Sequence, residues 1–135
     1  MTRSGKASSD FNLKNNWIRA EGPIEPSSEA LTHGAIYEGN PQAECVIHIH
    51  SADIWRNARQ LGITFTDPSI AYGTQAMGGA AQEAAGHASA GVLAMGGHED
   101  GVIAFAANVE QASVELLRCL AKALEFEQQS GGSNP

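Results

Sequence analysis

The sequence predicts one domain of α/β or α+β class, organised around a single sheet. Helical and extended patterns alternate along the chain, which is typical of helices packed on a sheet. The chain has 135 residues, 42% of them hydrophobic, which is the usual size of a single domain and enough for a hydrophobic core. No linker or internal repeat divides it, so we expect one domain over residues 1–127 and a disordered tail over residues 128–135.

The first predicted elements are a short extended segment and a helix. Asn16–Ala20 is a candidate strand, and the prolines that follow it keep the chain extended. A helix is expected over Glu29–Glu38, because serines and an acidic residue suit a helix start. The run Gly39-Asn40-Pro41 should end this helix.

The clearest strand is Glu44–His50, which is rich in β-branched residues and alternates along its length. Successive side chains of a strand point to opposite faces of the sheet. One face therefore carries Cys45, Ile47 and Ile49, and the other carries Val46, His48 and His50. Cys45 thus faces away from the histidines and is not proposed as a metal ligand.

The rest of the chain contains further helices and short strands. Ser51 caps a helix expected to end at Leu61, and Asn108 with Gln111 forms a capping-box pattern before the last helix. The other expected elements are a short strand at Ile63–Phe65, an Ala- and Gly-rich helix at Gln75–His87, and strands at Gly91–Met95 and Val102–Ala106. These are few strands for a complete sheet, which suggests a missing segment or a sheet finished by a partner.

Charge and cysteine content limit the classes of partner and location. Eight basic residues face fifteen acidic ones, for a net charge of −7, which argues against nucleic acid and anionic membrane surfaces. No apolar run is long enough for a membrane span, and the N-terminus lacks the apolar segment of a secretory signal. Cys45 and Cys119 are far apart and in no Cys-x-x-Cys motif, so we expect a cytoplasmic protein.

Three histidines form the candidate metal site. His48 and His50 lie on one strand face, about 6.5–7 Å apart along the strand, and such a pair can bind one ion at about 2.0–2.1 Å. His98 lies in a glycine-rich loop between two apolar strands, where the backbone can direct its side chain. Together they match an open three-ligand catalytic site. The alternatives are two hydrogen-bonded histidines on a sheet face and a third histidine at the surface.

Other polar residues have more than one interpretation. Glu29 is the candidate acid/base at a helix start, or it serves only the helix dipole. His33 either orients Glu29 from one turn away or is packed in the core. His87 is interpreted as a surface cation at a helix C-terminus. Glu99 and Asp100 are either partners of a metal-bound histidine or solvated loop charges.

Four sequence blocks together resemble the class II aldolase/adducin family over Thr2–Glu127. They are Pro26-Ser27-Ser28-Glu29, Thr32-His33-Gly34-Ala35-Ile36-Tyr37, Val46-Ile47-His48-Ile49-His50-Ser51 and Gly97-His98-Glu99-Asp100-Gly101-Val102-Ile103-Ala104-Phe105. The resemblance implies a three-layer α/β/α domain around one mixed, largely antiparallel sheet. It also implies a homotetramer with active sites at subunit interfaces. Relative to the family, an N-terminal part of the fold is expected to be missing.

The resemblance also implies the roles of individual residues. A divalent metal, usually zinc, is held by the residues that correspond to His48, His50 and His98. The acid/base carboxylate corresponds to Glu29, and a tyrosine from a neighbouring subunit, here Tyr72, protonates the product. Substrate phosphate is bound by two serines before the acid/base and by a Ser-Gly turn; the corresponding residues are Ser27, Ser28, Ser4 and Gly5.

The implied activity is that of a metal-dependent lyase. It would cleave or dehydrate a small, phosphorylated keto-sugar through a metal-stabilised enediolate. A sugar-phosphate epimerase is an alternative, but the family's epimerases carry Asp where this chain has Glu29. A second alternative is a catalytically silent module of the same fold that only binds metal or forms oligomers. Adducin head domains have lost the metal ligands, whereas this chain keeps all three, which favours an enzyme. A metal-assisted hydrolase on an unrelated fold would need a further carboxylate ligand, and none is identified.

Overall fold

The protein is built around a five-stranded sheet. The computed structural model describes residues 2–5, 9–12, 17–20 and 29–132, with side chains for 29–129. In spatial order the sheet contains β1 (Thr2–Gly5), β4 (Cys45–His50), β7 (Gly101–Ala106), β6 (Gly91–Ala94) and β5 (Thr64–Phe65). A separate antiparallel pair is formed by β2 (Ser9–Asn12) and β3 (Trp17–Ala20).

The sheet is mixed and largely antiparallel, as predicted. Strand β4 pairs antiparallel with β1 and with β7, and β7 pairs antiparallel with β6. The pairing of β5 with β6 is parallel. Strand β5 lies within the strand predicted at Ile63–Phe65, whereas the edge strand β1 was not predicted.

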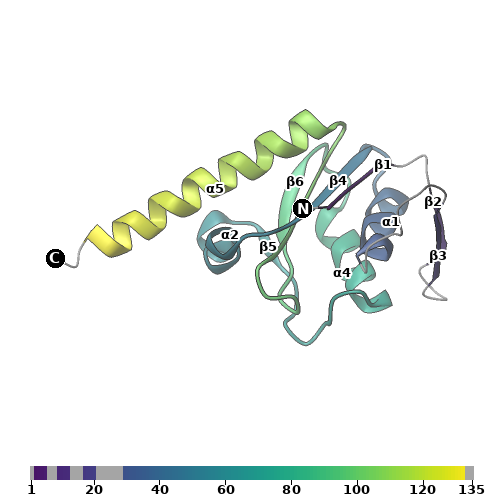
Figure 1. Ribbon diagram of the computed structural model, residues 1–135, viewed down its shortest axis with the longest axis horizontal. Helices are drawn as coiled ribbons and strands as arrows, with labels where there is room; N and C mark the ends of the chain where they lie inside the picture. The colour runs from purple at the N-terminus through teal and green to yellow at the C-terminus, as the bar shows by residue number, and fades with distance from the viewer. Residues whose placement is uncertain (1, 6–8, 13–16, 21–28, 133–135) are drawn as a thin grey trace.

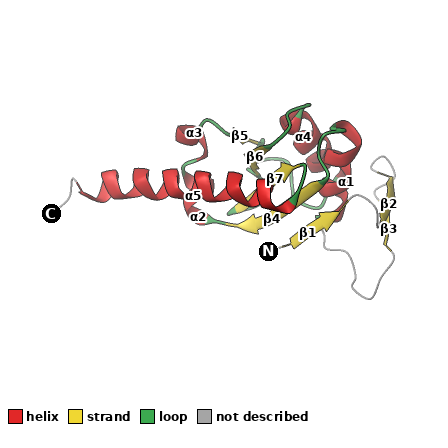
Figure 2. Ribbon diagram, turned by 90° about the horizontal axis from the view of Figure 1, so that it is seen from above, coloured by secondary structure: helices red, strands yellow, loops and turns green. Residues whose placement is uncertain are grey.

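Helices cover both faces of the sheet, which confirms the three-layer α/β/α class (Figure 1). One face carries α1 (Ala30–Gly39) and α4 (Gln75–Ala85), which pack against each other. The other carries α2 (Ala52–Arg56) and α5 (Val109–Gly132), with the short α3 (Ala58–Leu61) contacting both β5 and α5. The C-terminal part of α5 extends past the sheet (Figure 2).

The alternation predicted for β4 separates two hydrophobic cores. Val46 packs with residues of α1 and α4, including Ile36 and Met77. Cys45 and Ile47 pack on the opposite face with residues of α2, β7 and α5. Because β4 lies between β1 and β7 and is covered on both faces, its side chains from Cys45 to His48 are buried. Ile49 is half-buried and His50 is exposed, so the strand leads from the core to the surface at the two histidines.

Helix α1 is shifted by one residue from its predicted bounds, and three other helix boundaries differ by more. The helix expected over Ala52–Leu61 is divided at Asn57, whose side-chain amide donates to the Asp53 carbonyl at 2.7 Å and to Glu127 Oε1 at 3.0 Å. Helix α4 ends at Ala85, before Gly86 with its positive φ of 54°.

Helix α5 continues to Gly132, past the boundary predicted at residue 127. The glutamines after that boundary favour a helix, and Glu127 is held by Arg56 at 2.8 Å.

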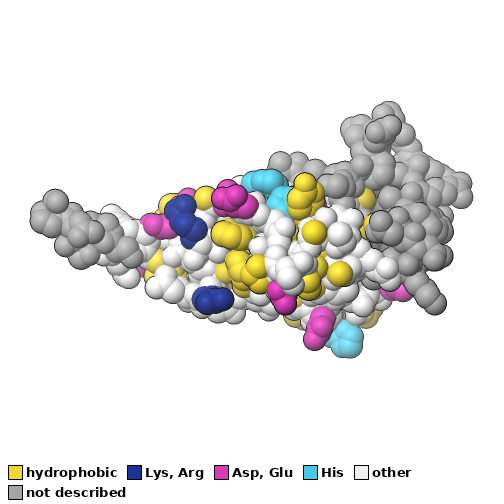
Figure 3. Space-filling model, turned by 90° about the horizontal axis from the view of Figure 1, so that it is seen from below, with side chains coloured by type: hydrophobic (Ala, Val, Ile, Leu, Met, Phe, Trp, Pro, Cys, Tyr) yellow, Lys and Arg dark blue, Asp and Glu magenta, His cyan; other side chains and the backbone are white. Residues whose placement is uncertain are grey.

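The surface agrees with the acidic composition. On the face in Figure 3, Lys and Arg appear as separate side chains and form no continuous basic patch. None of the helices in the described part of the chain combines the length and the apolar character needed to span a membrane.

Candidate metal centre and acid–base site

The structure brings His48, His50 and His98 together. One potential ligand nitrogen from each lies within 4.8 Å of the others. The Nε2 atoms of His50 and His98 are 3.0 Å apart. Two ligands of one tetrahedral zinc ion, each about 2.0–2.1 Å from it, are roughly 3.3–3.4 Å apart. Small side-chain movements would therefore bring all three nitrogens onto one ion.

The chemistry of these donors also fits a metal. The Nε2 atom of His48 is buried and has no hydrogen-bond partner among the described residues, and leaving such an atom unpaired costs free energy. Burial, with the positive charges of His98 and His50 as smaller causes, lowers the pKa of His48 to about 4. Burial also lowers the pKa of His98. Both imidazoles are therefore neutral at pH 7, which is the form that binds metal.

Backbone geometry directs His98 toward the strand. The turn between β6 and β7 is closed by hydrogen bonds from His98 N to Met95 O (3.1 Å) and from Gly101 N to His98 O (2.8 Å). Asp100 adopts a positive φ of 65°, and its carbonyl accepts from Ser51 N at 2.8 Å. A Cβ on Gly101 would lie 2.7 Å from His98 Cδ2, so glycine is needed there for the ring to pack.

The glycines before His98 let two loops pack against each other. A Cβ on Gly97 would lie 1.6 Å from the carbonyl oxygen of Ile70, and one on Gly96 would lie 1.9 Å from that of Thr66. Both obstacles are backbone atoms, so a side chain rotation cannot relieve them. The contact holds the loop of His98 against the loop that carries Tyr72.

We expect Gly97→Ala to lower the free energy of unfolding by about 3 kcal/mol, because overpacking against backbone forces the two loops apart. Gly79→Ala is the matched control, since a Cβ there meets no atom within 4 Å. Gly79 lies inside α4, where alanine should raise stability by about 0.5–1 kcal/mol. Urea unfolding of the metal-free proteins measures both changes. Equal stability of the two variants would contradict the packing argument.

Glu29 lies beside the histidine cluster as the N-cap residue of α1. Its side chain makes no capping hydrogen bond, although its place at the helix N-terminus is where the helix dipole favours a negative charge. The side chain is 2% exposed, and its Oε1 lies 3.6 Å from His98 Nδ1. Glu29 is not a member of the three-histidine group.

Burial raises the pKa of Glu29 above the ordinary carboxyl value, although Thr32, the positive charge of His50 and the backbone of Gly73 act in the opposite direction. A carboxyl group with a raised pKa can both accept and donate a proton near neutral pH. Sequence reasoning missed Thr32 and Gly73. The i, i+3 spacing of Glu29 and Thr32 on one helix was the available signal for Thr32, whereas nothing local indicated Gly73.

His33 is buried in α1, at 3% exposure, and burial lowers its pKa from 6.5 to about 4. Between these pH values the unfolded chain binds a proton that the folded protein does not, so stability rises with pH across this window. The expected loss from pH 7 to pH 5 is about 2 kcal/mol for this group. Acidification therefore destabilises the metal-free protein.

We expect His33→Gln to reduce the stability difference between pH 7 and pH 5 by about 2 kcal/mol. Denaturant unfolding at both pH values, after chelator treatment, measures it. His87→Gln is the control, because His87 is exposed. An unchanged pH dependence in His33→Gln would show that another group is responsible.

Tyr72 contacts the histidine cluster of its own chain. Its ring is 52% exposed and makes an edge contact with His98, with ring centroids 4.3 Å apart. The family resemblance implies a tyrosine from a neighbouring subunit, whereas here Tyr72 contacts the site of its own chain. The loop packing at Gly97 accounts for this placement.

The remaining candidates lie elsewhere. His87 and Glu99 are exposed, and Asp100 is half-buried in the turn. Ser4 and Gly5 belong to β1, where they pair with Val46 and Cys45. The residue of β1 that pairs with the metal-ligand candidate His48 is Thr2. Ser27 and Ser28 lie outside the described residues.

Comparison with known families supports this architecture. The family model for the class II aldolase and adducin N-terminal domain matches residues 7–127. The chain belongs to the class II aldolase/adducin family. A search of curated proteins found no significant match. Members of this family are usually metal-dependent and act on small molecules, and this class II aldolase/adducin domain has a histidine triad that could bind a metal.

Proposed function

We propose that this domain is a metal-dependent lyase of the class II aldolase type, acting on a small, phosphorylated keto-sugar. The observation that supports this most directly is the convergence of three histidines next to a buried carboxyl group. A set of three imidazole ligands leaves a coordination position for substrate. The proton-transfer group and the metal ligands would then contact the same substrate.

His48, His50 and His98 would hold the ion, which we propose to be zinc because imidazole nitrogen is a preferred zinc ligand. When bound, zinc supplies positive charge that stabilises the enediolate form of the substrate. All other steps rely on the protein's own side chains.

Glu29 is proposed as the acid/base at the reacting carbon. Its buried position excludes water, and the same burial raises its pKa, which favours the protonated form that a proton donor needs. In the cleavage direction, a base takes the proton of the hydroxyl group beside the breaking bond. The electrons of that bond move to the ketone fragment, whose carbon then takes a proton from Glu29. Tyr72 is proposed as the group that takes the proton of this hydroxyl oxygen in cleavage and returns it in the reverse direction, because its ring lies against His98 at the exposed side of the site.

We propose that Ser27, Ser28, Ser4 and Gly5 bind the substrate phosphate, on the strength of the family resemblance; Ser4 and Gly5 would do so from strand β1. A homotetramer is proposed on the same basis. A cytoplasmic location is proposed because the two cysteines, Cys45 and Cys119, are far apart in the chain and belong to no Cys-x-x-Cys motif.

The test is turnover by zinc-loaded protein on a panel of ketose 1-phosphates, with release of a carbonyl fragment or loss of water as the readout. The same protein after chelation, and the unphosphorylated sugars, are the controls. Turnover that requires both metal and phosphate supports the lyase. Bound zinc with no turnover of any substrate would overturn it in favour of a catalytically silent module, and inversion of a sugar carbon would indicate an epimerase.

A further inference from the structure

The loop that carries His98 is held from behind by a tryptophan of α2. The indole Nε1 of Trp55 donates a hydrogen bond to Met95 O at 2.8 Å. The same carbonyl oxygen accepts from His98 N at 3.1 Å. The carbonyl oxygen of Met95 therefore accepts hydrogen bonds from both the side chain of Trp55 and the backbone of His98.

A second hydrogen bond holds the next residue of this loop. Gly96 N donates to the hydroxyl oxygen of Thr66 at 2.9 Å, and Thr66 follows the edge strand β5. Thr66 is buried, at 5% exposure. The two side chains thus fix consecutive backbone groups, Met95 O and Gly96 N, before the chain reaches His98.

Aromatic packing supports the same loop. The rings of Trp55 and Phe65 lie 5.2 Å apart at an angle of 59°. A Cβ on Gly96 would lie 2.9 Å from Phe65 Cε1, so the backbone of the loop rests directly on this ring. Both rings are only half-buried.

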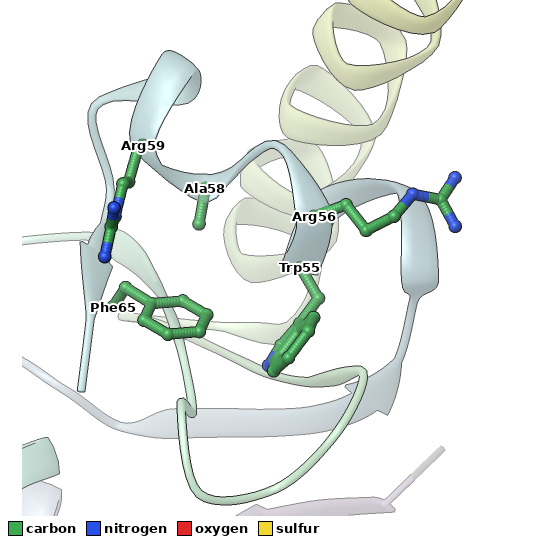
Figure 4. A pocket seen from close by; sticks show the side chains of 5 residues that line it. All are labelled: Trp55, Arg56, Ala58, Arg59 and Phe65. Atoms are coloured by element: carbon green, nitrogen blue, oxygen red, sulfur yellow. The ribbon is translucent and has the colours of Figure 1, made fainter. Parts of the chain in front are cut away.

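The outer side of these two rings is open. Trp55 and Phe65 line a hollow of about 420 Å³ together with Arg56, Ala58 and Arg59. Figure 4 shows the two rings side by side in this hollow, with Arg56 directed away from them. The indole therefore sits between the hollow and the loop, and its polar atom is directed to the loop.

We propose that Trp55 and Thr66 are positioning residues for the metal ligand His98. The inference rests on the proposed function, because it requires the three histidines to bind metal. Without either hydrogen bond, the loop has more conformations to lose when His98 joins the ion. Residues that orient metal ligands typically contribute about 10–100-fold to metal affinity.

The test is zinc affinity of the full chain, measured by competition with a chromophoric chelator. Trp55→Phe removes the indole donor and keeps an aromatic ring, and Thr66→Val removes the acceptor at similar volume. Each variant is expected to bind zinc about tenfold more weakly than the wild type. Arg59→Ala is the matched control, since it alters the same hollow without touching Met95 or Gly96, and it should bind like the wild type.

A double-mutant cycle separates positioning from general destabilisation. If Trp55 acts through His98, adding Trp55→Phe to His98→Ala should cause no further loss of zinc affinity. The visible spectrum of the cobalt-loaded protein should also change in Trp55→Phe and stay unchanged in Arg59→Ala. Neither readout follows from a loss of overall stability alone.

The outcomes distinguish the two proposals. A wild type that binds no zinc would overturn the metal site and this inference with it. A wild type that binds zinc, with Trp55→Phe and Thr66→Val equal to it, would overturn only the positioning role. Should either variant fail to fold, the other alone decides, because the two act on different atoms of the loop.

Discussion

Glu29→Gln is expected to lower turnover of the ketose phosphate by about 10²–10⁴-fold, the usual contribution of a general acid–base group. Glutamine has nearly the same shape as glutamate but cannot carry the transferred proton. The side chain is almost fully buried next to His98 and is not among the three clustered ligands. The zinc content should therefore stay at about one ion per chain. Steady-state kinetics with elemental analysis of the same samples measures both quantities.

The control for this substitution is Glu99→Gln. Glu99 follows His98 directly in the chain, but its side chain is exposed, so its removal should leave turnover near the wild-type value. The raised pKa of Glu29 also predicts a limb of the pH–rate profile above the normal carboxyl range, absent in Glu29→Gln. Full activity of Glu29→Gln would remove Glu29 from the mechanism.

The double variant His48→Ala/His50→Ala is expected to lose its metal entirely. Both imidazoles come from the C-terminal end of β4, and their rings lie 5.2 Å apart. Their removal leaves His98 as the one histidine of the cluster, and a single imidazole does not hold zinc against a chelator wash. Elemental analysis of freshly purified protein should give about one ion per wild-type chain and background in the variant.

His87→Ala is the matched control for histidine removal, because His87 is exposed and outside the cluster. It should keep the full metal content. Wild-type protein that stays metal-free after incubation with zinc would mean that the three histidines do not act as ligands. Metal retained by the double variant would place the ion elsewhere.

Local patterns were sufficient to predict most of the elements. The strand at residues 45–50 follows from its own alternation, and the helix caps follow from single side chains. Ser51 Oγ accepts from Ile54 N at 3.3 Å, and Asn108 Oδ1 accepts from Gln111 N at 2.9 Å. These interactions join residues three positions apart, so the sequence contains all the information that they need.

Long-range contacts explain the elements that were missed. Residues Thr2–Gly5 show no apolar alternation, and they form a strand because β4 offers an open edge for pairing. At the break between α2 and α3, the side chain of Asn57 donates a hydrogen bond to Glu127, near the far end of α5. No local window contains both partners of either contact.

The fold class, the family and the candidate residues could be predicted from the amino-acid sequence, because hydrophobic alternation and the four motif blocks are local features of the chain. How these residues meet depends on the folded structure. It places Glu29 at 3.6 Å from His98, turns Tyr72 onto the histidine of its own chain, and sets Trp55 behind the ligand loop. Each of these contacts joins different elements, and their geometry follows from the packing of helices and loops around the sheet.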